Sequence, residues 1–344
     1  MRSPWLAIAF KKGCAVNGAS AKPSVNRPPP AGEPSAEVVL GERISRANRA
    51  LSAVTPVLGH MLASSGHSLV SDAILARLRG MLTDLAHQLV RRIDAPILEG
   101  DAIAIDPVQA LAGQLAHDAP LLAHLHCNAM EGLLTGKLEK RSGIDPVLSP
   151  LWQELIASAN PATAEAAMQA LAAQSRFLQA QRRMQYPVFE LPADALERVL
   201  RIWARSIPLD HGPAVTGAMR ELKSDYDEAG TRIGQITRLA STMHAGLIAA
   251  LDVEHAGFAL FVSALARLSD QPRDRAVLAC HEHQSARLAL SLRATGQDAG
   301  AIERQALMFG SAEHLPHRLE QISSERARGL LADADRAAFV QSAG

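Results

Sequence analysis

Aromatic residues make up only 3% of this 344-residue chain, and the β-branched residues typical of strands are scarce. Alanine and leucine supply most of the 48% hydrophobic content, and both are good helix formers. A chain this rich in apolar residues can bury a sizeable core, which excludes global disorder. We therefore expect an all-α fold, either an irregular multi-helix bundle or an α-solenoid-like array.

Cysteine is also sparse, with Cys14, Cys127 and Cys280 as the three in the chain. They are odd in number and far apart, and no CxxC pair occurs, so the sequence suggests neither a disulfide framework nor a zinc ribbon. Thiols of this kind fit a reducing compartment. We expect a cytoplasmic protein.

The chain has no excess of charge of either sign, because 35 Lys and Arg residues balance 35 Asp and Glu residues. A neutral total argues against a dedicated nucleic-acid binder. No run of about eighteen apolar residues occurs, so we expect no membrane span. The short apolar run Trp5–Phe10 precedes Lys11 and Lys12, the reverse of the order in a secretory signal. The partner we expect is therefore another protein.

Residues 1–36 lack the apolar periodicity of a helix. The stretch 21–34 contains Pro23, Pro28, Pro29, Pro30 and Pro34, and such a composition favours extended, solvated conformations. The basic residues Arg2, Lys11, Lys12, Lys22 and Arg27 all precede the first acidic residue. We predict a disordered, basic, Pro-rich tail and interpret it as a solvated linker rather than a site for an anionic partner.

Capping residues followed by proline predict where four helices begin. The signals are Asp106-Pro107, Asp118-Ala119-Pro120, Asp145-Pro146 and Asn160-Pro161. An Asp or Asn side chain can accept a hydrogen bond from a free N–H of the first turn, and proline is tolerated there because it has no N–H to leave unpaired. These starts predict helices of roughly ten to twenty residues that are separated by short breaks.

A domain boundary is predicted at Ile207–Gly217, which contains Pro208, Gly212 and Pro213 and has little periodicity. It separates an N-terminal helical subdomain, 37–206, from a C-terminal helical subdomain, 207–344. The charged segment that follows, Arg220–Arg232, is interpreted as a solvated face or loop.

The C-terminal subdomain is organised around two predicted helices, Leu247–Leu268 and Pro272–Ala294. Apolar residues recur at steps of three and four along the first helix. The second has two usable apolar faces, so it should lie between neighbours rather than on the outside. We expect Leu265 and Leu288 to be buried in this core.

Parts of the chain resemble a known family. The matching segments are Ser175-Arg176-Phe177-Leu178, Glu190-Leu191-Pro192-Ala193, Phe258–Leu268, Arg273–Val277 and Leu288–Gly296. They resemble a large α-helical family of alphaproteobacterial proteins known only as a domain of unknown function, over the C-terminal half of the chain. The resemblance implies an all-α fold with no assigned activity, and it carries over no functional residue.

Common catalytic signatures are missing from the sequence. Neither a GxGxxG nor a GxSxG motif occurs. Gly132–Lys137 ends like a phosphate-binding loop, but Leu138 stands where a hydroxyl would be needed for magnesium. His281-Glu282 begins like a zinc-protease helix, but Ser285 stands where the second histidine belongs. We predict no catalytic residue.

Two clusters of metal-ligand residue types remain, 124–127 (His-Leu-His-Cys) and 280–283 (Cys-His-Glu-His). Residues three apart share one face of a helix. If the two helices met, a tetrahedral site could be formed by His124, Cys127, Cys280 and His283. However, buried cysteine acts as a small hydrophobe, and the histidines of each His-x-His pair point roughly 160° apart on a helix. We expect no metal and no cofactor.

The sequence favours a helical binding or scaffold/regulatory module without catalysis. The alternative is an enzyme or metal-binding protein that uses the clusters His124–Cys127 and Cys280–His283. A third interpretation is a sensory module whose halves move about Ile207–Gly217. The first two differ in whether Cys127 and Cys280 come close in space.

Overall fold

The computed structural model describes residues 35–63, 72–93, 106–207, 211–310, 315 and 319–343. Within these ranges the secondary structure is helical and contains no strand, so the prediction of an all-α fold is confirmed. Residues 1–34, nearly all of the predicted tail, lie outside the described residues. The first helix begins at Ala36, and the Ser35 hydroxyl accepts a hydrogen bond from the Val38 N–H at 3.3 Å.

The helices follow one another with short connections. Up to residue 206 they are α2 (Ala36–Ala63), α3 (Asp72–Val90), α4 (Pro107–Leu115), α5 (Ala119–Ser142), α6 (Pro150–Ile156), α7 (Pro161–Arg182), the 3-10 turn η1 (Val188–Glu190) and α8 (Ala193–Ser206). From residue 211 onward they are α9 (Gly212–Asp225), η3 (Glu228–Gly230), α10 (Arg232–Thr242), η4 (His244–Leu251), α11 (Val253–Ser269), α12 (Arg273–Ala279), η5 (Glu282–Gln284), α13 (Ser285–Ala294), α14 (Ala299–Met308), η7 (Leu319–Gln321) and α15 (Ser324–Ala343).

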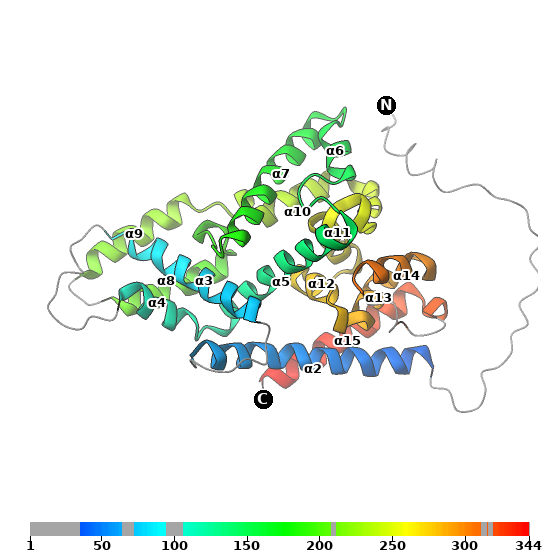
Figure 1. Ribbon diagram of the computed structural model, residues 1–344, viewed down its shortest axis with the longest axis horizontal. Coiled ribbons are helices and arrows are strands. Elements are labelled where there is room, and N and C mark those ends of the chain that lie inside the picture. The colour runs from blue at the N-terminus through cyan, green and yellow to red at the C-terminus, as the bar shows by residue number, and fades with distance from the viewer. Residues whose placement is uncertain are drawn as a thin grey trace, which may run out of the picture.

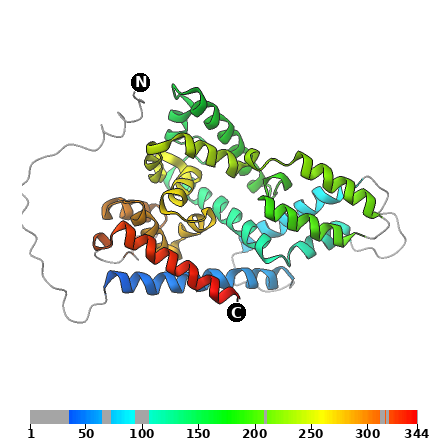
Figure 2. The ribbon, with the colours of Figure 1, turned by 180° about the vertical axis from the view of Figure 1, so that it is seen from behind.

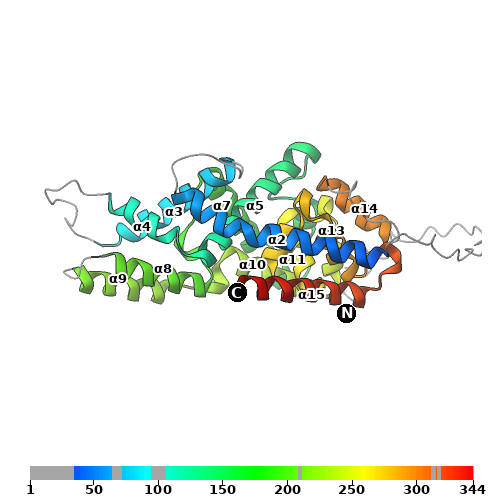
Figure 3. The ribbon, with the colours of Figure 1, turned by 90° about the horizontal axis from the view of Figure 1, so that it is seen from below.

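The molecule is elongated, and α2 runs along one side of it (Figure 1). Helices α3, α4, α8 and α9 gather at one end, whereas α11 to α14 gather at the other. The views from behind and from below both place α15 beside α2 (Figures 2 and 3), and the two helices are in contact. The first and last helices of the described chain thus pack against each other.

Two hydrophobic clusters form the interior, and α5 belongs to both. Its Leu125 lies in the cluster built by α3, α4, α8 and α9, while its Leu134 lies in the larger cluster around α11 and α13. Val215 of α9 packs in the first of these clusters. The clusters therefore divide the chain elsewhere than at Ile207–Gly217, and the predicted division into two subdomains stays a prediction.

Three of the four predicted helix starts are confirmed. The side chains of Asp106, Asp118 and Asn160 cap α4, α5 and α7 by accepting hydrogen bonds from N–H groups of the first turn. The prediction at Asp145-Pro146 is wrong, because α6 begins at Pro150. Asp145 Oδ1 instead accepts hydrogen bonds from the N–H groups of Val147 and Leu148, at 2.8 and 2.7 Å. Such side-chain bonds form a turn that competes with a helix.

The predicted pair of long helices is more broken than expected. The first, Leu247–Leu268, is confirmed only from Val253 onward, as α11; its first five residues belong to the 3-10 helix η4, which is bent by 117° from α11. Helix α11 also kinks at Gly257, where φ is 70° and a Cβ would lie 3.1 Å from the Ser149 hydroxyl. The second, Pro272–Ala294, is wrong as one helix and is instead α12, η5 and α13. The break lies at His281, whose backbone is extended and whose ring accepts a hydrogen bond from the His283 N–H. This local bond lies in the break that follows the end of α12 at Ala279.

Both residues predicted to anchor this core are fully buried: Leu265 on α11 and Leu288 on α13 have no exposed area. We expect Leu265→Ala and Leu288→Ala each to lower the free energy of unfolding by about 2–5 kcal/mol, because each leaves a cavity among close-packed side chains. Urea denaturation measures the loss. Leu307→Ala is a matched control, since Leu307 is 59% exposed. Near-neutral results at both buried sites would contradict this account of the core.

No single helix among the described residues is long and apolar enough to cross a membrane. Helices η4 and α11 reach the required length and composition only together, and they are bent by 117° at the break between them. The apolar side chains of α11 lie in the larger hydrophobic cluster.

Candidate functional site

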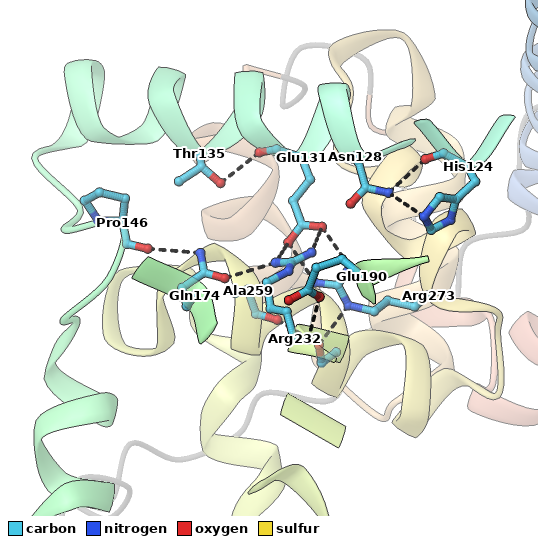
Figure 4. A network of polar contacts seen from close by, with 11 residues as sticks. His124, Asn128, Glu131, Thr135, Pro146, Gln174, Glu190, Arg232, Ala259 and Arg273 are labelled. Atoms are coloured by element: carbon cyan, nitrogen blue, oxygen red, sulfur yellow. Dashed lines mark hydrogen bonds and ion pairs between the residues drawn. The ribbon is translucent and has the colours of Figure 1, made fainter. Parts of the chain in front are cut away.

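A stripe of polar side chains runs along the buried helix α5. His124, Asn128, Glu131 and Thr135 follow one another at steps of four, three and four, which places them on one face of the helix (Figure 4). Asn128, Glu131 and Thr135 are each less than 9% exposed. Buried polar groups need partners, so this face directs the polar contacts of the interior.

Glu131 is the centre of this stripe and holds two arginines from distant parts of the chain. Its two carboxylate oxygens accept two hydrogen bonds of 2.7 Å from the guanidinium of Arg232, at the start of α10. They accept two more of 2.8 Å from Arg273, at the start of α12. Both pairs are bidentate, the strongest geometry between arginine and a carboxylate. Glu131 is 1% exposed and Arg232 2%.

Neutral groups complete the coordination of the two guanidinium groups. The Gln174 side-chain oxygen on α7 accepts a hydrogen bond from Arg232 Nη1 at 3.0 Å, and the Ser263 hydroxyl accepts one from Arg273 Nε at 3.1 Å. The Phe177 ring stacks on the Arg232 guanidinium, with 3.7 Å between its centroid and Cζ. The cluster thus ties α5, α7, α10, α11 and α12 together.

The charges of the cluster decide the ionisation of its carboxylate. Burial by itself would raise the pKa of Glu131, but the charges and hydrogen bonds of Arg232 and Arg273 hold it well below its usual range. Glu131 therefore stays ionised throughout the neutral range. With every oxygen accepting from an arginine, it is poorly placed to accept a proton from anything else.

The start of α10 is fixed by a second carboxylate. Glu190 Oε2, from η1, accepts a hydrogen bond from the Arg232 N–H at 2.7 Å, and the Thr231 hydroxyl accepts one from the Gly234 N–H at 3.1 Å. Negative charge at a helix N-terminus is stabilising. These caps hold Arg232 at the end of the helix from which its side chain reaches Glu131.

The sequence interpretation of Arg220–Arg232 as a solvated face is wrong at its last residue. The acidic residues within it, Glu221, Asp225, Asp227 and Glu228, are exposed as predicted. Arg232 is buried because Glu131, Gln174 and the Phe177 ring replace the water that its charge would otherwise need.

A pocket of about 360 Å³ opens beside this cluster, within the size range of small-molecule sites. Arg232 and Asn128 form part of its inner wall. It is also lined by Arg176, Phe177, Ala180, Gln181, Gln185, Tyr186, Pro187, Phe189, Glu190, Asp225, Asp227, Gly230 and Ile233. The pocket therefore lies between the end of α7, the η1 turn and the η3–α10 junction.

One wall of the pocket is stiffened by a chain of contacts through Tyr186. Its hydroxyl donates a hydrogen bond to the Glu190 carbonyl at 2.9 Å and lies 2.6 Å from His124 Nε2. Its N–H donates to Asp84 Oδ2 on α3 at 2.9 Å. Burial lowers the pKa of His124 to about 4 and raises that of Tyr186 well above its usual range. Both side chains are neutral at physiological pH.

The structure places the four candidate metal ligands in different surroundings. Helices α5 and α12 are in contact, and the thiols of Cys127 and Cys280 are both buried in the larger cluster. However, His124 contacts Tyr186 and Asn128, whereas His283 lies exposed in η5. Across the described ranges, no group of three or more His, Cys, Asp or Glu side chains could hold a metal ion. The four residues therefore do not form one site here.

We expect both buried thiols to be unreactive in the folded protein. Burial raises the pKa of the Cys127 and Cys280 thiols well above the usual range, and the thiolate is the reactive form. In a Cys14→Ser variant at pH 8, iodoacetamide should modify neither thiol within an hour, but both in 6 M guanidinium chloride. Mass spectrometry counts the adducts. Rapid modification without denaturant would show that the thiols are accessible or activated.

Sequence analysis missed Glu131, Arg232 and Arg273, the residues that build the cluster. The available signal was the polar stripe on α5, where four polar residues at steps of four, three and four lie among apolar residues in roughly the first two thirds of the helix. That signal indicates a buried polar network, but it does not identify the arginines.

A scan against protein-family models, a search of curated proteins and a search of solved structures each gave no match to this chain. The resemblance to the alphaproteobacterial α-helical family therefore stays a prediction.

Proposed function

We propose that this protein is a helical binding module without catalysis, and that its ligand occupies the pocket between α7, η1 and α10. The observation that carries the proposal is the pocket itself, a preformed space of about 360 Å³ beside a buried ionic cluster. Preorganised walls favour binding, because the protein loses little conformational freedom when the ligand enters.

The surroundings of the pocket support a preformed site. Arg232 and Tyr186 line it. Arg232 is held by the hydrogen bond that it donates to Glu131 of α5, and Tyr186 by the one that it donates to the Glu190 carbonyl of η1. Gln181 lines it as well and is 4% exposed, and its side-chain amide is held in the interior, where Nε2 donates to Met81 Sδ at 3.8 Å.

Glu131 and His124 lie behind the pocket, where they contact its lining residues Arg232 and Tyr186, and their state supports binding rather than proton transfer. A general acid or base needs a pKa near the working pH and a free position toward the substrate. Glu131 is ionised and fully bonded to two arginines, while His124 has a pKa of about 4 and contacts Tyr186. Because these groups are already bonded to other side chains, they stabilise the wall of the pocket and are not free to transfer protons.

A thermal-shift screen tests the proposal with a defined panel of the twenty amino acids, nucleotides, sugar phosphates and dicarboxylic acids. A ligand present at about a hundred times its Kd stabilises the folded state by about 2.7 kcal/mol, which corresponds to a rise in Tm of about 4 °C for a chain of this length. In the variant Ala180→Phe, whose ring would fill the pocket, the shift should disappear.

Lys223→Gln is the matched control, because Lys223 is exposed on α9 and does not line the pocket. It should respond to the ligand as the unmodified protein does. A panel that leaves Tm unchanged throughout, or a shift that persists in Ala180→Phe, would contradict the proposal.

A further inference from the structure

The pocket carries unpaired charges of both signs. Arg176, exposed on α7, and Asp225, at the end of α9, line the pocket, and neither forms an ion pair or hydrogen bond with a described residue. Their charged atoms are therefore more than 4 Å apart. Glu190 adds a further acceptor, because only its Oε2 accepts a hydrogen bond from a described residue. A positive and a negative group face the same space without neutralising each other.

Arg232, the other cation of the lining, is already bonded to Glu131 and Gln174. Asp227 is engaged only through Oδ1, which accepts a hydrogen bond from the Ala229 N–H at 3.0 Å. The groups left to meet a ligand are therefore the Arg176 guanidinium, the Asp225 carboxylate, and one carboxylate oxygen each of Glu190 and Asp227. This argues against a phosphate or other dianion, because the carboxylates would repel it. It also argues against a simple amine, which would leave Arg176 unmatched.

Besides the amides of Asn128, Gln181 and Gln185, the remaining wall is apolar and aromatic. Phe177, Tyr186 and Phe189 line the pocket. The Phe177 ring has the Arg232 guanidinium on one face, and Arg92 lies over the Phe189 ring at 5.3 Å. Since Phe177 and Phe189 each already have a cation nearby, the capacity of these two rings to attract a further cation is reduced. They suit the apolar body of a ligand better than its charged group.

Resting on the proposed binding function, we propose that the pocket binds a free amino acid with a large apolar side chain. Arg176 binds the carboxylate, Asp225 and Glu190 bind the ammonium group, and the aromatic wall contacts the side chain. A volume of about 360 Å³ accommodates a ligand of this size. Because Arg176 and Asp225 are exposed, each ion pair contributes little and the affinity is modest.

The test uses the full chain and three probes that differ in one charge each. L-Phenylalanine carries both charges, 2-phenylethylamine lacks the carboxylate, and 3-phenylpropionate lacks the ammonium group. Titrations followed by NMR chemical shifts give the Kd of each probe. We expect L-phenylalanine to bind at least about three-fold more tightly than either analogue, the effect of an exposed ion pair of somewhat under ~1 kcal/mol.

Two substitutions of exposed residues test which side chain binds which charged group of the ligand, and neither disturbs the core. Arg176→Gln should raise the Kd of L-phenylalanine several-fold and leave the Kd of 2-phenylethylamine unchanged. Asp225→Asn should raise the Kd of L-phenylalanine and leave that of 3-phenylpropionate unchanged. Lys223→Gln should change the Kd of none of the three probes. Circular dichroism checks that each variant is folded.

The outcomes separate this inference from the proposed function. If an analogue binds as tightly as L-phenylalanine, or if L-phenylalanine fails to bind while another compound of the panel binds in a way that Ala180→Phe abolishes, the amino-acid assignment is wrong and the pocket remains a binding site. If no compound binds in this way, both the assignment and the binding function are wrong.

Discussion

Glu131→Ala is expected to lower the free energy of unfolding by about 5 kcal/mol, the upper end of the range for breaking a buried ion pair. The reason is that one carboxylate serves two arginines. Its removal leaves the guanidinium groups of Arg232 and Arg273 facing each other with no negative partner, and Arg232 is 2% exposed. Since single domains are typically stable by about 5–15 kcal/mol, the variant should lose about a third or more of its stability. Urea denaturation followed by circular dichroism measures the effect.

Two further variants separate charge from packing. Replacing all three residues, as Glu131→Leu, Arg232→Met and Arg273→Met, should recover most of the lost stability, because no charge is then left without a partner. Glu197→Ala breaks the exposed pair with Lys223, in which the side chains are 46% and 55% exposed, and should cost less than about 1 kcal/mol. A loss below about 2 kcal/mol in Glu131→Ala would show that water or another acceptor reaches the arginines.

The helices were predictable where local chemistry alone determines them. Asp106, Asp118 and Asn160 each cap the helix that the sequence predicts, because the bond from the side chain to the first turn depends only on neighbouring residues. The same reasoning failed at Asp145, where the side chain bonds the two N–H groups of a turn and α6 begins later, at Pro150. An Asp or Asn followed by proline can cap a helix or form a turn, so the sequence alone does not distinguish the two.

The candidate site was not predictable in the same way, because its contacts join distant parts of the chain. Glu131 and Arg232 are 101 residues apart, and Glu131 and Arg273 are 142 apart. In sequence, Arg232 ends a charged segment and Arg273 follows a proline, so both look like solvated surface residues. Only the contacts with Glu131 show that Arg232 is buried and Arg273 half-buried.

For the candidate metal ligands, the sequence suggested a proximity that the structure does not show. Spacing along a helix predicts that Cys127 shares a face with His124 and that Cys280 shares one with His283. The helix break at His281 removes the second relation, because it places His283 in η5 rather than on α12. A pattern based on regular helix geometry fails wherever the helix ends inside the pattern.

Acidification from pH 7.5 to pH 4.5 is expected to destabilise the protein before any carboxylate of the ionic cluster is protonated. Burial lowers the pKa of His124 and of His126 to about 4, and the nearby His281 lowers that of His126 further. Above the ordinary value of 6.5 both histidines are neutral in the folded and unfolded states, so the full stability is present. As the pH falls from 6.5 toward 4, the unfolded chain binds protons that the folded protein does not, and stability is lost.

The size of this loss follows from the two pKa values. A difference between 6.5 and about 4 corresponds to roughly 3 kcal/mol for each histidine. Urea denaturation at half-unit steps of pH gives the slope, and the variant His124→Gln, His126→Asn should be distinctly flatter between pH 6.5 and 4.5. Leu288→Ala is the matched control, because it lowers stability without removing a titrating group and should shift the curve in parallel. An unmodified protein whose stability stays constant down to pH 4.5 would mean that both histidines reach water when they are protonated.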